Sequence, residues 1–388
     1  MSKVYQYLRH LPLLSKPVRA THFVDKTDKL YPLFKYSYDI SKTLYKRLGP
    51  RKDGSDSFLH PLNIANHLKQ VGVTDVVTLS AALLHDYIEE LVDIYKKEQG
   101  LTEKGDDAKL LDDLELEYYN QLTQDLIAVA KKHKLPTTRA ILLADVVHVL
   151  TRQKRHFYYY SVASIFTEES KSVRERAIHV KLADRLHNIA CVDSFQPAGK
   201  LYQGYKSLYI LNCAKKYLLN AYGEKIFVSK SNTLERLFNK CAKRTYAVFQ
   251  DIIGGCDSGY LREVRYMLQL ALKKYALQHN GLSIINTTDA YGDHPLTLYE
   301  GVVEKYDARL RKDWGHYDSF TEKETTFAKQ FFDGAKKDDI TQILRYKDAY
   351  VLKEVVARLI YHTDFLITDF VYNELSTEGQ LKPLLRKQ

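Results

Sequence analysis

Apolar residues recur at intervals of three and four along nearly every long segment of this chain, which is the spacing of one face of an α-helix. Residues 30–48 show the pattern clearly, with apolar side chains at Leu30, Leu33, Phe34, Tyr38, Leu44, Tyr45 and Leu48. Gly49-Pro50 should end that helix, because glycine tolerates a left-handed C-terminal turn and proline cannot continue the hydrogen-bond ladder. We therefore predict an all-α fold, a helical bundle followed by a second helical unit.

The 388 residues suffice for one large domain or two ordinary ones, and 45% hydrophobic and 27% charged residues are typical of a soluble globular protein. The formal net charge of +10 favours polyanions, which include nucleic acid, anionic membranes and phosphorylated nucleotides alike. The chain shows neither a signal-peptide pattern nor the roughly 18 consecutive apolar residues that span a bilayer. We expect a cytoplasmic protein with no membrane partner.

The cysteines, Cys191, Cys213, Cys241 and Cys256, are widely scattered and form no C-x-x-C pair. This pattern is typical of ordinary thiols in a reducing compartment and not of a disulfide framework or a zinc site. The expected chemistry therefore rests on histidines and carboxylates.

A boundary is indicated at about residues 223–231, after which Asn232-Thr-Leu-Glu235 has the form of a capping box that opens a new helix. We predict two domains, residues 1–222 and residues 223–388, the second of unknown role. Helical spacing in the first covers residues 63–71, 75–88, 110–133, 138–150 and 173–189. In the second it covers residues 234–253, 261–279, 299–310, 327–332 and 350–375, with a Gly/Asn/Asp/Pro-rich loop at residues 286–295.

Side chains with the chemistry of metal ligands occur at three separated places. They are His60, before a proline; the pair His85-Asp86, after an apolar run; and, much later, Asp184. Brought together by folding, two imidazoles and two carboxylates would hold one divalent cation beside a nucleophilic water, which is the equipment of a metal-dependent phosphohydrolase. Taken alone, a histidine before a proline such as His60 is more often a hydrogen-bonded loop residue than a ligand.

Asp86, Glu89 and Glu90 are spaced so that a helix would place their carboxylates on one face. Three acids there need a counter-charge, and either a metal at Asp86 or a solvated acidic surface would satisfy them. The preceding run, residues 79–84, is strongly apolar and should be buried. Acids that emerge directly from a core helix are more often functional.

Asp184 lies in the apolar pattern of a buried helix, with Asn188 four residues further along the same side. Burying an isolated carboxylate costs on the order of several kcal/mol, so Asp184 should be paired or ligated. A structural ion pair with Lys181 or Arg185 is the alternative to metal coordination.

Four separated blocks carry a further resemblance. They read Arg51-Lys-Asp-Gly54, His60-Pro61, Ala81-Ala-Leu-Leu-His-Asp-Tyr-Ile-Glu-Glu90 and Lys181-Leu-Ala-Asp-Arg-Leu-His-Asn188. In this order they resemble the HD-type hydrolase domain of the RelA/SpoT alarmone enzymes and their small stand-alone relatives. The resemblance covers roughly residues 20–215 and says nothing about the remainder.

The resemblance implies a single divalent cation, usually manganese in that family, with four ligands: His60, His85, Asp86 and Asp184. Iron, cobalt or zinc would also suit histidine nitrogen combined with carboxylate oxygen. Glu89 and Glu90 would take the paired-acid role, in which they orient and deprotonate the attacking water or pass a proton to the leaving ribose oxygen.

The same resemblance implies contacts with a nucleotide substrate. Arg51 and Lys52 would neutralise phosphate, or Arg51 would stack on the base, and simple solvation of their loop is the alternative. Asn188 would bind near the sugar or phosphate, with Lys181 as a further substrate contact.

Three features depart from the family pattern. Glu90 replaces an aspartate, which adds one methylene and moves the carboxylate by about an ångström. Ile-Ala-Cys-Val follows Asn188 where the family has Met-Arg-Thr, so a cationic substrate contact is missing. The segment from Glu90 to Asp184 is longer than in compact members, and its acidic stretch at residues 105–117 suits a solvated excursion better than a lid.

The expected function is therefore removal of the 3′-pyrophosphate from (p)ppGpp or an adenine analogue. Two alternatives stay open: a non-catalytic alarmone-sensing module, and an HD phosphohydrolase that acts on another nucleotide. The helical C-terminal half lacks the alternating strands of a synthetase domain, so the chain should degrade alarmone and not make it. Its tyrosines at helical spacing are typical of packing, so no nucleic-acid partner is expected, while regulation, homo-oligomerisation or covering the active site stay open.

Overall fold

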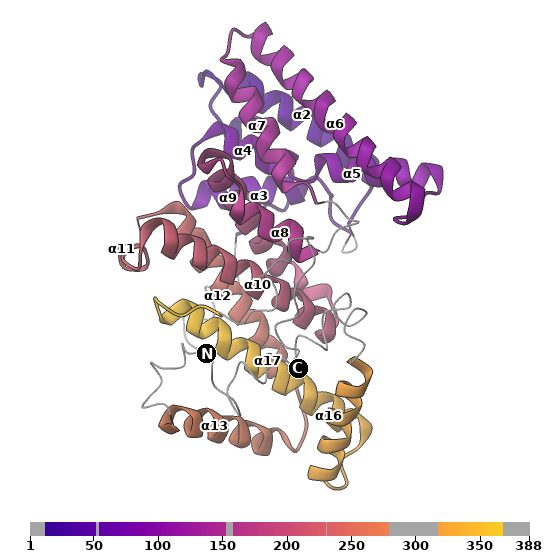
Figure 1. Cartoon of the computed structure of the whole chain (residues 1–388), viewed down its shortest axis with the longest axis vertical. Coiled ribbons are helices and arrows are strands. Elements are labelled where there is room, and N and C mark those ends of the chain that lie inside the picture. Colours follow the sequence, from indigo (N-terminus) through magenta and orange to yellow (C-terminus); the bar gives the residue numbers. More distant parts are fainter. Residues whose placement is uncertain (1–11, 52–53, 153–157, 230, 279–316, 368–388) are drawn as a thin grey trace.

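The computed structural model describes residues 12–51, 54–152, 158–229, 231–278 and 317–367, and within these ranges it contains helices and no β-strand (Figure 1). The elements in chain order are η1 (Ala20–His22), α2 (Tyr31–Leu48), α3 (Leu59–Gln70), α4 (Val76–Leu84), α5 (Tyr87–Gln99), α6 (Gly105–Lys132), α7 (Thr137–Leu150), α8 (Tyr158–Thr167), α9 (Lys171–Ala190), η2 (Val192–Ser194), α10 (Pro197–Tyr222), α11 (Ile226–Ser229), α12 (Thr233–Gly254), α13 (Leu261–Gln278), α16 (Tyr317–Phe331) and α17 (Lys337–Tyr361). The predicted all-α fold is confirmed for this part of the chain. None of the helices described is both long and apolar enough to cross a bilayer.

Two helices begin at the capping residues that the sequence indicates. The carboxylate of Asp75 accepts the backbone N–H of Thr78 and caps α4. The side-chain oxygen of Asn232 accepts the N–H groups of Leu234 and Glu235 and caps α12. Local side-chain chemistry therefore sets where these helices start.

The single helix predicted for residues 75–88 is wrong, because the chain breaks at His85-Asp86. α4 ends at Leu84, and Asp86, with φ −104° and ψ 5°, precedes the first residue of α5. Glu89 and Glu90 lie in the first turn of α5, where the helix dipole favours negative charge. The acidic stretch at residues 105–117, expected as an excursion, forms the first part of the long helix α6.

One hydrophobic core connects most of the helices. α9 packs on α3, α4 and α7, and α10 and α12 continue the same core from α9 towards α17. In Figure 1 the helices from α2 to α7 gather at one end of the molecule, with α10 and α12 in the middle. Buried residues from both sides of position 222, such as Leu208, Tyr209, Phe238 and Val355, belong to this core. The division into residues 1–222 and 223–388 stays a prediction, and its boundary falls within continuous packing.

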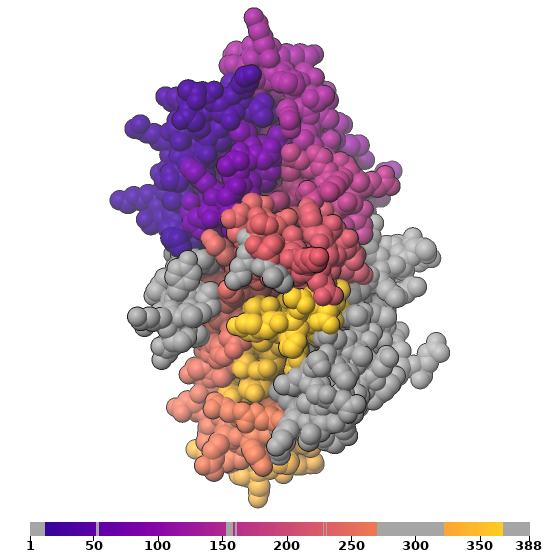
Figure 2. Space-filling model, turned by 90° about the vertical axis from the view of Figure 1, so that its left-hand side faces the viewer, coloured from indigo at the N-terminus to yellow at the C-terminus, as the bar shows by residue number. Residues whose placement is uncertain are grey.

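A smaller hydrophobic cluster lies at the other end and joins α13, α16 and α17 through side chains such as Val264, Phe332 and Ile343. Figure 2 shows the yellow surface of α17 directly below the red surface of the central helices. α16 and α17 begin earlier than the predicted segments 327–332 and 350–375, at Tyr317 and Lys337. The predicted helix at residues 299–310 and loop at residues 286–295 lie outside the described residues.

Two buried polar side chains of α10 hold the end of α17 and the residues that follow it. The ammonium of Lys215 donates to the carbonyl of Leu359 at 2.9 Å and also to that of His362. Asn212 exchanges two hydrogen bonds with the backbone of Ile367, at 2.9 and 3.1 Å. The bonds of Lys215 satisfy carbonyl groups at the C-terminal end of α17, where a positive charge is also favourable.

Gly204 of α10 allows close approach of Phe249 of α12, because a Cβ at Gly204 would lie 2.5 Å from two ring atoms of Phe249. We expect Gly204→Ala to lower the free energy of unfolding by about 1–3 kcal/mol, measured by urea denaturation. Gly254→Ala is the matched control, since nothing lies within 4 Å of a Cβ there, and it should change stability by less than about 0.5 kcal/mol. Equal effects of the two substitutions would contradict tight packing between α10 and α12.

Candidate metal centre

Three packed helices and one helix junction bring the predicted ligands together. His60 lies in the first turn of α3, His85 and Asp86 lie between α4 and α5, and Asp184 lies in the second half of α9. α9 packs against both α3 and α4, as Figure 1 also shows, so these residues meet although they are far apart in the sequence.

The Nε2 atoms of both histidines face the two carboxylates. His85 Nε2 lies 2.9 Å from Asp86 Oδ2 and 4.0 Å from Asp184 Oδ1. His60 Nε2 lies 3.5 Å from Asp86 Oδ2 and 3.7 Å from Asp184 Oδ1. His60, His85 and Asp86 each offer one ligand atom, all within 4.8 Å of one another, and so form a group that could hold a metal ion. The histidines are buried, whereas the side chain of Asp86 is 30% exposed and opens the cluster to solvent.

A hydrogen bond on the far side of the His85 ring directs its Nε2 atom into the cluster. His85 Nδ1 lies 3.0 Å from the carbonyl oxygen of Ala82, which can only accept, so the proton of the neutral ring sits on Nδ1. The lone pair of Nε2 then points towards the carboxylates, and this buried atom has no hydrogen-bond partner among the described residues. A buried nitrogen lone pair beside two carboxylates fits a divalent cation with nitrogen and oxygen ligands.

A second histidine orients His60. His60 Nδ1 and His187 Nδ1 lie 3.0 Å apart, so one nitrogen donates a proton and the other accepts it. When Nε2 of His60 serves as a ligand, His60 Nδ1 must donate, and His187 carries its own proton on Nε2, 3.7 Å from the sulfur of Cys191. Burial, and then the nearby ionisable ring of His60, lowers the pKa of His187, which keeps this ring neutral. This buried series of hydrogen-bonded side chains therefore fixes the orientation of the His60 ring.

The charge states of both aspartates and of His60 suit metal ligation. Burial alone would raise the pKa of Asp184, but Lys181 and the two histidines together lower it below its ordinary value. Burial likewise opposes ionisation of Asp86, and His85 and His60 outweigh it, so its pKa is also lowered. Burial lowers the pKa of His60, although Asp86 and Asp184 oppose the shift. At neutral pH both aspartates are therefore ionised and His60 is neutral, as metal ligands must be. Burial would lower the pKa of His85, but Asp86 and then Asp184 raise it above its ordinary value, so a cation would have to displace a proton from this ring.

Two residues that were predicted to bind the substrate, Lys181 and Asn188, instead contact the carboxylate of Asp184. Lys181 Nζ lies 3.1 Å from Asp184 Oδ2, and Asn188 Nδ2 donates to Asp184 Oδ1 at 2.5 Å. The ion pair with Lys181, which the sequence left open, is thus present beside the cluster. Arg185, the other candidate partner, instead donates to Gln203 Oε1 on α10 at 2.8 Å.

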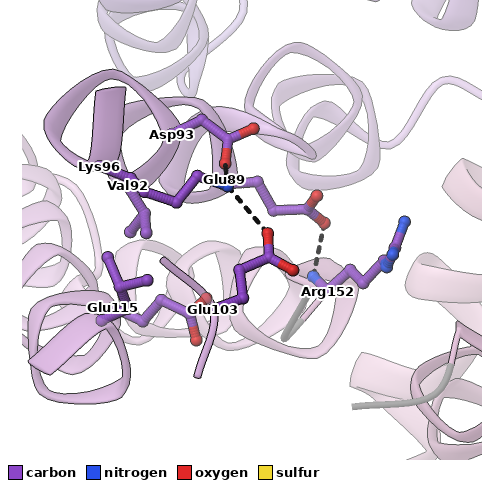
Figure 3. Close-up of a pocket in the computed structure, with 8 residues that line it drawn as sticks. Glu89, Val92, Asp93, Lys96, Glu103, Glu115 and Arg152 are labelled. Atoms are coloured by element: carbon purple, nitrogen blue, oxygen red, sulfur yellow. Dashed lines mark hydrogen bonds and ion pairs between the residues drawn. The ribbon is translucent and has the colours of Figure 1, made fainter. Parts of the chain in front are cut away.

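The paired acids at the start of α5 have different surroundings. Glu89 Oε1 accepts the backbone N–H of Arg152 at 2.6 Å, beside a small hollow that Asp93, Lys96, Glu103 and Glu115 also line (Figure 3). Glu90 is half-buried on the same turn. Its negative charge adds to the effects of burial and of Asp86, which raise the pKa of Tyr45. The two carboxylates are therefore not equivalent.

The basic loop is described only in part. The backbone N–H of Arg51 donates to the carbonyl of Ser55 at 2.9 Å, and that of Gly54 to the carbonyl of Arg51 at 2.8 Å, so Arg51 lies in a turn. The positive charge of Arg51 acts on both Tyr45 and His187, so it lies within electrostatic reach of these two residues. Lys52 lies outside the described residues.

Tyr45 and His187 are candidates to which sequence reasoning gave no role at the site. The buried hydroxyl of Tyr45 has no hydrogen-bond partner in the described part of the chain. Burial, and then the charges of Asp86 and Glu90, raise the pKa of Tyr45 well above 10, so the phenol keeps its proton beside these acids. It can donate that proton to an oxygen bound there. Tyr45 reads as an ordinary apolar helix position, whereas His187 lies within the block that ends at Asn188 and could have been singled out.

Comparison of the chain with protein-family models, with curated proteins and with solved structures gave no match. The likeness to HD-type alarmone hydrolases therefore stays a prediction that rests on four sequence blocks. The candidate metal site rests on the geometry of the side chains themselves.

His187 should set the affinity for a cation through its bond to His60. We expect His187→Phe to weaken Mn²⁺ binding by about 10–100-fold, because it keeps the ring volume and removes the acceptor for His60 Nδ1. Calorimetric titration of the purified protein with Mn²⁺ measures the change. His179→Phe is the matched control, since His179 is a histidine of the same helix that bonds to Thr233. Equal losses in both variants would contradict a positioning role for His187.

His67 should make the protein less stable in mild acid. Burial, and then the charge of Lys240, lowers the pKa of His67 from 6.5 to about 4, so below pH 6.5 the unfolded chain binds a proton that the folded protein does not. Stability is therefore complete above pH 6.5 and falls as the pH drops towards 4. Between pH 7.5 and 4.5 the wild type should lose about 2–3 kcal/mol more than His67→Phe in urea unfolding. The same pH dependence in both proteins would refute this assignment.

Proposed function

We propose that this protein is a metal-dependent phosphohydrolase of the HD type that removes the 3′-pyrophosphate from (p)ppGpp or an adenine analogue. The observation that supports the reaction class is the convergence of His60, His85 and Asp86 into one group, with Asp184 Oδ1 3.7 and 4.0 Å from the two Nε2 atoms. The choice of substrate rests on the resemblance of the four sequence blocks that contain these residues.

In this proposal His60, His85, Asp86 and Asp184 hold the divalent cation, manganese or another. When bound, the cation supplies Lewis-acid polarisation of a phosphoryl oxygen and lowers the pKa of a water molecule. Glu89 and Glu90 follow Asp86 by three and four residues and act as the acceptors for the proton of the attacking water. The backbone N–H of Arg152 stabilises the ionised carboxylate of Glu89, which is the form that a proton acceptor needs.

The basic residues have separate roles in the proposal. Lys181 is ion-paired with Asp184 and keeps that ligand ionised, and Asn188 holds its second oxygen. Arg51, which lies in a turn, meets the phosphate of the substrate. The hydroxyl of Tyr45 donates to an oxygen of the substrate or of the attacking water.

The purified protein with Mn²⁺ should release pyrophosphate from ppGpp. Asp86→Asn and Asp184→Asn should each lower kcat/KM by at least about 10³-fold, because each removes a charged ligand at the reacting centre. Asp106→Asn, which changes an exposed aspartate at the start of α6, should leave the rate unchanged. Ion chromatography of the products measures the reaction.

The outcomes separate the alternatives. Full turnover by both ligand variants would refute the site. Tight nucleotide binding by the wild type with no product over hours would favour a sensing module. Turnover of a different phosphorylated nucleotide in a substrate panel would keep the reaction class and replace the substrate.

A further inference from the structure

An open groove follows α7 between α6 and α8, at the end of the molecule where α6 and α7 pack together (Figure 1). It consists of two adjoining hollows of about 500 and 380 Å³, and His148, Val149 and Glu168 line both of them. Ile141 and Val149 are eight residues apart on α7, so the groove follows that helix for about 12 Å, or roughly two turns. We call the two hollows together the α7 groove.

The walls of the α7 groove are mainly apolar. Leu116 of α6 lines the larger hollow and is 55% exposed, and Ile141 of α7 lines the smaller one and is 41% exposed. The buried side chains of Ile88 and Val173 form part of the floor. Hydrocarbon is thus left in contact with water in a concave surface, where contact with a second apolar surface would be favourable.

Carboxylates dominate the charge of the groove. Asp113 and Glu168 line the larger hollow, and Asp145 and Glu168 line the smaller one. Asp145 accepts the hydroxyl of Tyr119 and Glu168 accepts the backbone N–H of Ser170, both at 3.0 Å. Among the described residues no lysine or arginine forms an ion pair with any of these three carboxylates, and none lines either hollow. The groove is therefore acidic although the whole chain carries a net charge of +10.

The occupant that fits this surface combines positive charge with apolar side chains. Nucleic acid and anionic membranes have the wrong charge. A metal ion or a polyamine supplies positive charge, but neither has side chains to fill two hollows of this size. A basic amphipathic helix has both properties, because its apolar residues recur every three or four positions along one face and its lysines or arginines flank that face.

The larger hollow reaches the turn that carries the paired acids of α5. Ile88 lies next to Glu89, and Thr151, which also lines this hollow, precedes Arg152, whose backbone N–H is bonded to Glu89. Figure 3 shows Glu89 and Arg152 around the small neighbouring hollow, together with Glu115, which lines the α7 groove as well. A helix seated in the α7 groove would therefore lie against the segment that positions Glu89.

We propose that the α7 groove is a docking site for a basic amphipathic helix of a partner protein. Apolar side chains of that helix cover Leu116 and Ile141, and its lysines or arginines pair with Asp113, Asp145 and Glu168. The proposal goes beyond the reaction assigned to the metal centre and does not depend on it, because none of these five residues has a role there.

The probe is a fluorescently labelled peptide of leucine and lysine of about 14 residues, roughly four helical turns, with leucine on one helical face and lysine on the other. Fluorescence anisotropy with the purified full-length protein at physiological ionic strength should give a dissociation constant on the order of 10 μM. A twin peptide with glutamate in place of lysine should bind at least about 10-fold more weakly, because like charges repel. No binding of the lysine peptide at about 1 mM protein, or equal binding of both peptides, would overturn the proposal.

The charge test neutralises the three groove carboxylates together, with Asp113→Asn, Asp145→Asn and Glu168→Gln. These substitutions keep the side-chain acceptor oxygens and should weaken binding of the lysine peptide by about 10-fold or more. The matched control makes the same change of net charge at three exposed acids elsewhere, Glu224→Gln, Asp257→Asn and Asp338→Asn. The control should bind within about twofold of the wild type. Equal weakening in the two triple variants would show general charge attraction and overturn the site.

The apolar test uses two exposed leucines of α6. Leu116→Ser should weaken binding by about 3–10-fold, because it removes apolar surface that the peptide covers. Leu110→Ser is the matched control, since Leu110 is 46% exposed and does not line either hollow, and it should bind like the wild type. A Leu116→Ser protein that binds as tightly as Leu110→Ser would overturn the groove. Displacement of the peptide by an equal concentration of spermine would identify a polyamine site and also overturn the proposal.

Discussion

The arrangement of the N-terminal helices depends on burying the carboxylate of Asp184 within α9. Removing an ionised carboxylate from water costs on the order of several kcal/mol unless nearby charges and donors compensate. Here Lys181 lies one turn before Asp184, Asn188 lies one turn after it, and two imidazoles approach from other helices. α3 and α4 must therefore pack directly on α9, and the apolar faces of these helices form the core around that contact.

The break between α4 and α5 is the second requirement of the site. Neighbouring residues of an uninterrupted α-helix point about 100° apart, so His85 and Asp86 could not both face one ion from such a helix. With the chain broken at Asp86, His85 Nε2 and Asp86 Oδ2 approach to 2.9 Å. The same break places Glu89 and Glu90 in a first turn, where the free N–H groups favour their ionised forms. One local irregularity thus positions both the ligand pair and the paired acids.

The sequence predicted α2, α12 and the start of α4 because apolar spacing and capping residues such as Asp75 and Asn232 act locally. It did not single out α8 or α10. It predicted that His60 would meet His85 and Asp86, because two imidazoles and a carboxylate from separate blocks together have the chemistry of a metal site. It could not predict the break at His85-Asp86. Leu84 and Ile88 are four residues apart, which is helical spacing, and no glycine or proline lies between them. The capping residue Asn232 marks the start of a helix. It carries no information on whether one hydrophobic core continues across the predicted domain boundary. The orphan hydroxyl of Tyr45 could not be predicted either, since an unpaired buried atom is a property of packing.

α10 connects the candidate site to the C-terminal half of the chain. Near its start Gln203 accepts a hydrogen bond from Arg185, the neighbour of Asp184, and Gly204 packs against Phe249 of α12. Further along, its buried Asn212 and Lys215 hold residues 359–367 through hydrogen bonds to their backbone. A helix fixed at both ends by tertiary contacts cannot rotate or slide without breaking buried polar bonds, each of which is costly to leave unmade. The C-terminal helices therefore brace α10, the helix that contacts Arg185 beside Asp184.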